Sequence, residues 1–143
     1  MNGMTLYMEL LEIVLEAMPA ENAAPLLAFL QERGKCSRVE GSLAQALNET
    51  GACCYIFPRL HLGQELHDFS AHFYFGNGTW EVCLLFFPAL PDRDFAGEAA
   101  RLAPVREACQ EMFATFRPRR IVCGFEPAID DDMRIFTIEE GTA

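Results

Sequence analysis

The sequence is poor in basic residues, since 11 lysines and arginines stand against 21 aspartates and glutamates and leave a net charge of −10. A field of this sign repels phosphate backbones, so general nucleic-acid binding is excluded. The chain also lacks a long apolar run, because Glu9, Glu12 and Glu16 interrupt its N-terminal apolar segment and no basic stretch precedes that segment. We therefore expect neither a membrane span nor a secretory signal, and a cytoplasmic location.

Metal-binding spacings are lacking as well. None of the six cysteines forms a C-x-x-C pair, two are adjacent and several lie in apolar runs, which favours reduced thiols over zinc or disulfides. The spacings between His61, His67 and His72 fit neither a helix face nor a continuous strand alternation, so these are expected to be loop histidines rather than metal ligands. Asp130–Asp132 is expected to be a solvated acidic turn. The cysteines are Cys36, Cys53, Cys54, Cys83, Cys109 and Cys123.

Apolar residues are present in the quantity that a packed core needs. The 143 residues are 51% hydrophobic and 22% charged, which indicates a globular chain, and this length predicts one domain over residues 1–143.

Helical patterns dominate the first third of the chain. Leu6, Leu10, Leu11, Val14, Leu15 and Met18 recur at steps of three and four with glutamates off that stripe, which predicts an amphipathic helix over Thr5–Met18. Capping and proline signals predict the others. These are a helix with Pro25 in its first turn and Gly34 past its end, one from Ser42 to Gly51, and one from about Gly97 to Phe116 that Pro104 kinks or splits.

Strand patterns follow Gly51. We expect a loop over His61–Asp68, a polar stretch over Pro88–Asp94 and a turn or single helical turn over Pro127–Asp132. The expected strands are Ala52–Phe57, Ser70–Phe75, Thr79–Phe87, Arg120–Glu126 and Met133–Glu140. The predicted fold class is α+β (mixed α/β), with N-terminal helices followed by a mixed, partly antiparallel sheet that a helix crosses.

A hairpin at Gly76-Asn77-Gly78 is the strongest local signal, because Asn-Gly supplies the positive φ angles of a tight turn. With Asn77 and Gly78 as the central residues, the register is fixed. One face then carries the apolar pairs Phe75–Trp80, Phe73–Val82 and Ala71–Leu84.

The other face of this hairpin would pair Tyr74 with Glu81 and His72 with Cys83. A carboxylate beside a phenol and an imidazole suits proton abstraction from an amine or thiol, which makes Glu81, His72 and Tyr74 candidate catalytic residues. The alternative is an ordinary polar sheet face, turned to water or covered by a helix.

The segment from Trp80 to Phe136 resembles the central part of GNAT-type N-acetyltransferases, particularly small phage and prophage members. The strand Trp80–Pro88 and the pair of segments Glu111–Thr115 and Arg120–Pro127 carry this resemblance. It implies a GNAT-like fold with acetyl-CoA in a gap between two splayed parallel strands, and an amine as the second substrate.

Carried over residue by residue, Leu85, Phe86 and Phe87 would face the pantetheine arm of acetyl-CoA, opposite Val122–Phe125. Gly97 and Ala99 would form the pyrophosphate loop, with Arg93 offsetting the charges of Asp94 and Glu98. This sequence departs from the family's pattern at those two acidic residues and in its short C-terminus.

Two functions stay open at this point. One is an acyl-CoA-dependent N-acyltransferase. The other is a non-catalytic acidic interaction or chaperone-like protein on a degenerate GNAT-like or other α+β scaffold, which binds a protein partner and could form a homodimer.

Overall fold

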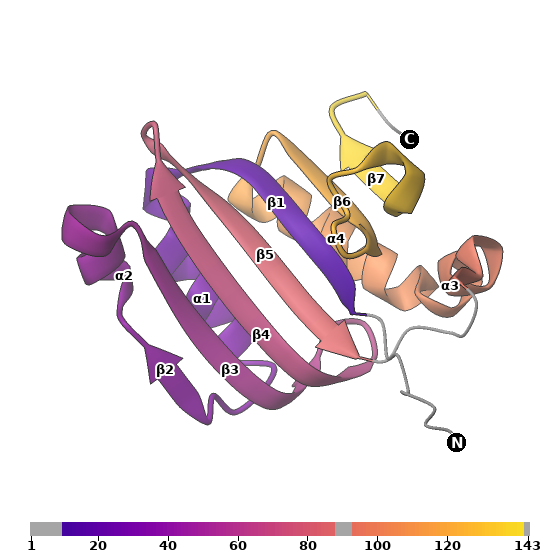
Figure 1. Ribbon diagram of the computed structural model, residues 1–143, viewed down its shortest axis with the longest axis horizontal. Helices are drawn as coiled ribbons and strands as arrows, with labels where there is room; N and C mark the ends of the chain where they lie inside the picture. Colours follow the sequence, from indigo (N-terminus) through magenta and orange to yellow (C-terminus); the bar gives the residue numbers. More distant parts are fainter. Residues whose placement is uncertain (1–9, 88–92, 142–143) are drawn as a thin grey trace, which may run out of the picture.

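Seven strands form one sheet in the computed structural model, which describes residues 10–87 and 93–141 (Figure 1). Their order is β2-β3-β4-β5-β1-β6-β7, and every neighbouring pair is antiparallel. The α+β class is confirmed, whereas the predicted mixture of parallel and antiparallel pairs is wrong. The strands are β1 (Leu11–Pro19), β2 (Arg38–Glu40), β3 (Ala52–His61), β4 (Glu65–Gly76), β5 (Thr79–Phe87), β6 (Arg120–Phe125) and β7 (Arg134–Glu139).

The first element is a strand and not the helix predicted over Thr5–Met18, of which residues 5–9 lie outside the described part of the chain. β1 lies inside the sheet between β5 and β6, so both of its edges are paired, and most of its residues are buried on both faces. Leu11, Ile13 and Leu15 point into the main core, while Val14 belongs to a smaller cluster on the opposite face. A strand that is buried on both faces has no regular alternation of apolar and polar residues. Its apolar residues can therefore recur at steps of three and four, the spacing that predicts a helix.

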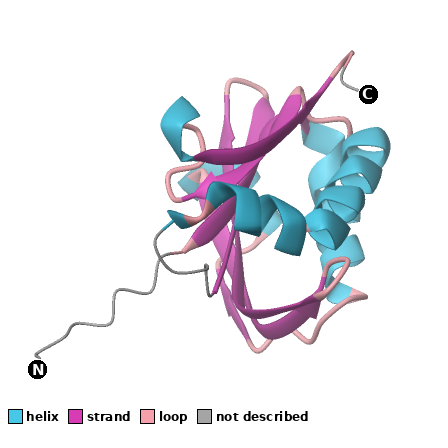
Figure 2. Ribbon diagram, turned by 90° about the vertical axis from the view of Figure 1, so that its right-hand side faces the viewer, coloured by secondary structure: helices cyan, strands magenta, loops and turns pink. Residues whose placement is uncertain are grey.

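Two helices, α1 (Ala23–Gln31) and α4 (Ala103–Phe116), cover one face of the sheet (Figure 2). Their buried side chains include Leu26 and Leu30 from α1 and Met112 from α4. The rings of Phe29 and Phe116 meet edge to face at 5.4 Å. The core therefore lies between this helical layer and the sheet.

Most helix signals in the sequence are confirmed. Pro25 is the third residue of α1, which follows a 3-10 turn over Ala20–Asn22. Ser42 accepts a hydrogen bond from the Gln45 amide at the start of α2 (Leu43–Gln45), which continues as a π-helical segment, η2 (Ala46–Thr50). The predicted 97–116 helix is divided into α3 (Phe95–Arg101) and α4, with Pro104 in the first turn of α4. None of the described helices is long and apolar enough to span a membrane.

β3 and β4 are longer than predicted. β3 continues through Pro58 to His61, and β4 already begins at Glu65, so the predicted loop over His61–Asp68 is wrong for most of its length. Pro58 is tolerated because β2 pairs with β3 only at residues 54–56, which leaves this part of β3 at the sheet edge.

The predicted hairpin is confirmed with its register. Phe75 pairs with Trp80, Tyr74 with Glu81 and His72 with Cys83, and Asn77 and Gly78 have φ angles of 54° and 79°. Trp80, Val82 and Leu84 are buried on the helical side. The alternate residues therefore lie on the side of the sheet opposite α1 and α4, which we call the open face.

The segment between β6 and β7 returns over the open face, and a single 3-10 turn forms over Asp131–Met133 as predicted. Ala128 is fully buried there against Val14 and Val122. The open face is therefore covered beside β1 and β6, and accessible over β4 and β5.

Candidate functional site

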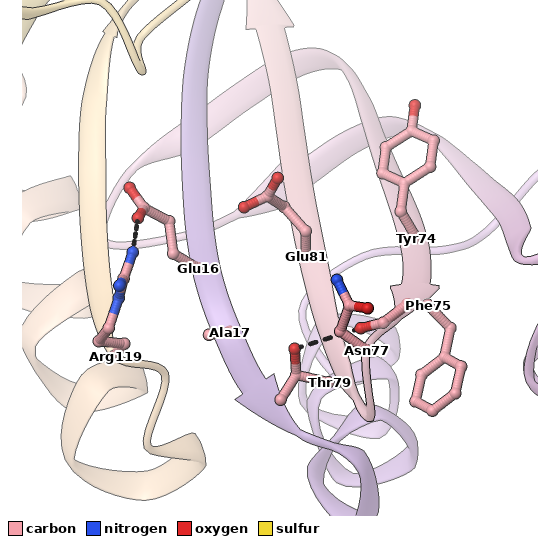
Figure 3. Close-up of a pocket in the computed structure, with 9 residues that line it drawn as sticks. Glu16, Ala17, Tyr74, Phe75, Asn77, Thr79, Glu81 and Arg119 are labelled. Carbon is pink, nitrogen blue, oxygen red and sulfur yellow. Dashed lines mark hydrogen bonds and ion pairs between the residues drawn. The ribbon is translucent and has the colours of Figure 1, made fainter.

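The accessible part of the open face contains a hollow of about 320 Å³ where β4, β5 and β1 lie side by side (Figure 3). Tyr74, Glu81 and Glu16 project to the same side of these three strands. Tyr74 is 46% exposed, although it is a large aromatic side chain. The hollow is lined by Glu16, Ala17, Tyr74, Phe75, Gly76, Asn77, Thr79, Glu81 and Arg119.

Glu16 forms the wall of the hollow on β1 and is neutralised by two arginines. Arg119 Nη2 donates to Glu16 Oε1 at 2.9 Å, and Arg120 Nε donates to Oε2 at 2.9 Å. Only 4% of Glu16 is exposed. This carboxylate therefore has its charge compensated inside the protein.

Glu81 differs from Glu16 in this respect. Within the part of the chain that the structure describes, no cation lies within 4.0 Å of its carboxylate. Burial, followed by the charge of Glu16, raises the pKa of Glu81, while Arg119 acts in the opposite direction. Glu81 is thus a carboxylate whose charged form an external cation would stabilise.

His72 lies next to Tyr74 on β4, and their rings stack at 6.4 Å with an interplanar angle of 9°. Its Nε2 lies 2.9 Å from Ser70 Oγ and 3.9 Å from Cys54 Sγ. Burial lowers the pKa of His72, and burial raises the pKa of both Cys54 and Tyr74. The neutral forms of all three groups are favoured.

Cys83 lies opposite His72 in the β4–β5 register and is also partly buried. Burial, with the nearby charge of Glu12, raises its pKa to about 12. A thiol must be deprotonated to act as a nucleophile, so this environment disfavours the reactive form. All six cysteines are free thiols. The open face therefore disfavours a thiolate nucleophile at Cys83.

Glu12 connects the open face to the segment between β6 and β7. Its Oε1 accepts a hydrogen bond from the Ala128 amide at 2.9 Å, and 8% of the residue is exposed. Burial raises its pKa, an effect that the Ala128 hydrogen bond opposes and the charge of Glu126 reinforces. Arg134 holds the same segment through the carbonyl oxygens of Ala128 and Ile129.

The predicted acetyl-CoA gap is absent from its expected place. The resemblance implies a gap between Trp80–Phe87 and Arg120–Glu126, but β1 lies between these strands and pairs with both. Leu85 and Phe86 are paired with Glu12 and Leu11 of β1, and Phe87 lies beside them at the end of β5. Acetyl-CoA binding itself stays a prediction, without the gap in which it was placed.

The predicted pyrophosphate loop is the start of α3. The Gly97 amide donates to Asp94 Oδ1 at 2.9 Å, so the helix cap uses the group that was assigned to phosphate. Ala99 lies within α3, and Arg93 Nη1 lies 3.6 Å from Met133 Sδ. The structure does bring the candidate catalytic residues Glu81, His72 and Tyr74 together on β4 and β5, whereas Gly97 and Ala99 belong to α3.

Histidines, cysteines and acidic residues do not converge on a metal site anywhere in residues 10–87 and 93–141. His61 and His67 lie on β3 and β4 near the turn that joins these strands, away from the Tyr74–Glu81 pair in the register.

The sequence pattern did not indicate Glu16 and Arg119 as lining residues of the hollow, because the spacing of Glu16 predicts the polar side of a helix.

Residues 9–141 match the family model described as PABL017 Cdi1I immunity protein. A chain in the 1.75 Å crystal structure of the toxic C-terminal tip of CdiA from Pseudomonas aeruginosa in complex with immune protein has the same fold, with a TM-score of 0.74 at 17% identity. The alignment covers 92% of this chain and 95% of that chain. No curated protein matches the sequence significantly.

The family match overturns the resemblance to GNAT-type acetyltransferases. The predicted acyl-CoA-dependent N-acyltransferase activity is wrong, and with it the assignment of an amine substrate. The alternative, a non-catalytic interaction protein, agrees better with the findings.

Proposed function

This chain belongs to the PABL017 Cdi1I immunity protein family, and we propose that it neutralises a CdiA-type toxin tip by binding it. The observation that carries the proposal is the extent of the family match, since residues 9–141 include every strand of the sheet. The active partner is then a protein, and this chain acts stoichiometrically in the cytoplasm and not by turnover.

The chemistry of the open face supports a binding role. Its central thiol and imidazole are held in neutral forms, and Tyr74 offers an accessible aromatic surface beside a carboxylate. Aromatic side chains surrounded by polar groups are typical of protein-binding surfaces.

The test is protection in cells followed by binding in solution. The CdiA tip from the source genome is expressed with and without this chain, and we expect growth arrest only without it. The two proteins should then co-purify, and calorimetric titration of the tip, recovered from the complex by denaturation and refolding, should end at one equivalent. An intact chain that neither restores growth nor binds the refolded tip would refute the proposal.

A further inference from the structure

We propose that the hollow between Tyr74 and Glu81 receives an arginine side chain of the toxin tip. The inference rests on the proposed function, and it names the contact surface and the chemistry of the partner.

The first argument is geometric. Tyr74 and Glu81 are directly opposite each other in the β4–β5 register, so the phenol ring and the carboxylate border one hollow of about 320 Å³ (Figure 3). Both side chains come from paired strands within the sheet, which fixes the backbone positions from which they project before a partner arrives. A fixed backbone reduces the conformational entropy that is lost on binding.

The second argument is charge. Glu16 is already bound by Arg119 and Arg120, whereas Glu81, beside Tyr74, forms no ion pair with any residue that the structure describes. Arg119 also lines the hollow, but its guanidinium lies on the Glu16 side, and its side chain is 73% exposed. The whole chain carries a net charge of −10, which attracts a cationic partner.

The third argument concerns the kind of cation. A guanidinium is planar, stacks on an aromatic ring and donates two parallel hydrogen bonds to a carboxylate, whereas an ammonium offers a point charge. Tyr74 supplies the ring and Glu81 the carboxylate. This pair of neighbours therefore favours arginine over lysine.

Two other hollows lack this combination. One is lined by Lys35, Ser37, Pro58 and Arg59, and the other by Arg119, Arg120 and Glu139. Each contains two cations and no aromatic ring, so neither suits a guanidinium.

The experiment measures calorimetric affinity for the refolded toxin tip. Glu81→Gln and Tyr74→Ala should each weaken binding by about tenfold or more, as expected for central contacts. Tyr74→Phe keeps the ring and should stay within about threefold. Glu111→Gln, an exposed charge change on α4 at the other side of the sheet, is the matched control and should leave affinity unchanged.

The double variant identifies the shared ligand. If one arginine contacts both side chains, Tyr74→Ala with Glu81→Gln should weaken binding by less than the product of the single effects. Raising NaCl from about 50 to about 300 mM should weaken the wild type more than Glu81→Gln, because screening acts on the charge that the variant lacks.

Each outcome separates the two proposals. Failure of the wild type to bind the tip would refute the proposed function. Wild-type binding with unchanged affinity of Glu81→Gln and Tyr74→Ala would leave that function intact and overturn this inference. An arginine-to-alanine scan of the tip should find one arginine whose loss makes Glu81→Gln neutral; finding none would also overturn it.

Discussion

Glu16 and Arg120 face each other across the neighbouring strands β1 and β6, and Arg120 Nε donates to Glu16 Oε2 at 2.9 Å. Arg119 binds the other carboxylate oxygen from the turn that precedes β6. One buried acidic group therefore joins the first strand of the chain to a segment more than a hundred residues later.

The two arginines should contribute unequally to stability. Arg120 is mostly buried, so Arg120→Ala should lower the free energy of unfolding by about 1.5–3 kcal/mol, the usual range for a hydrogen bond to a charged group. Arg119 is mostly exposed, and Arg119→Ala should cost no more than about 1 kcal/mol. Urea denaturation measures both, and equal losses would contradict this explanation.

Glu12 should make stability depend on pH. Burial raises its pKa above the ordinary value of 4.5, so the folded state binds the Glu12 proton more tightly than the unfolded state does. The resulting contribution to the free energy of unfolding is complete below pH 4.5 and is lost as pH rises through the raised pKa. The groups around it are the Ala128 amide, Cys83 and the Glu126 carboxylate.

Glu12→Gln removes this titration while the amide oxygen still accepts from Ala128. The unfolding free energy of the variant relative to the wild type should therefore be higher at pH 7.5 than at pH 4. Urea denaturation at both pH values is the measurement, and a relative stability that is equal at both, or higher at pH 4, would show that Glu12 does not carry the effect.

Ile13 tests the position of β1 in the sheet. It is 0% exposed and lies opposite Leu84 on one side and Cys123 on the other. Ile13→Ala should lower the unfolding free energy by about 2–5 kcal/mol, because a buried side chain is lost and a cavity is left. Val39→Ala on the exposed strand β2 is the control and should stay within about 1 kcal/mol.

Gly124 tests the close approach of β6 to the start of β7. A Cβ at this position would overlap the Met133 carbonyl oxygen, which belongs to the backbone and cannot rotate away. Gly124→Ala should destabilise the fold by about 1–3 kcal/mol and increase hydrogen exchange at the Ala128 amide. Gly76→Ala, where a Cβ meets nothing within 4 Å, is the matched control. Equal stability of the two variants would exclude a steric role for Gly124.

Turn, capping and proline residues in the sequence predicted the turns and helix boundaries that they themselves form. Asn77-Gly78 determined the β4–β5 register, Ser42 marked the start of α2, and Pro104 marked the division between α3 and α4. These features depend on backbone conformation within a few residues, which the sequence specifies directly.

β1 could not be predicted in the same way, because its environment is made by distant residues. Glu12 and Glu16 have the spacing of a solvated helix face, yet Ala128 and the arginines after α4 cover them. For the same reason, only part of the candidate site could be predicted. The hairpin register predicts that Tyr74 and Glu81 are neighbours, whereas Glu16 and Arg119 reach the hollow only through the packing of β1 and the turn after α4 in the folded chain.

The central place of β1 has a consequence for synthesis. Leu11 is synthesised before both of its partners, Phe86 and Phe125, and the second lies more than a hundred residues later in the chain. Until β5 and β6 have been made, both edges of the apolar strand β1 are unpaired. Unpaired apolar strands promote aggregation of a nascent chain. The centre of the sheet therefore closes only after β6 has been made, and a chain truncated before β6 would leave one edge of β1 unpaired.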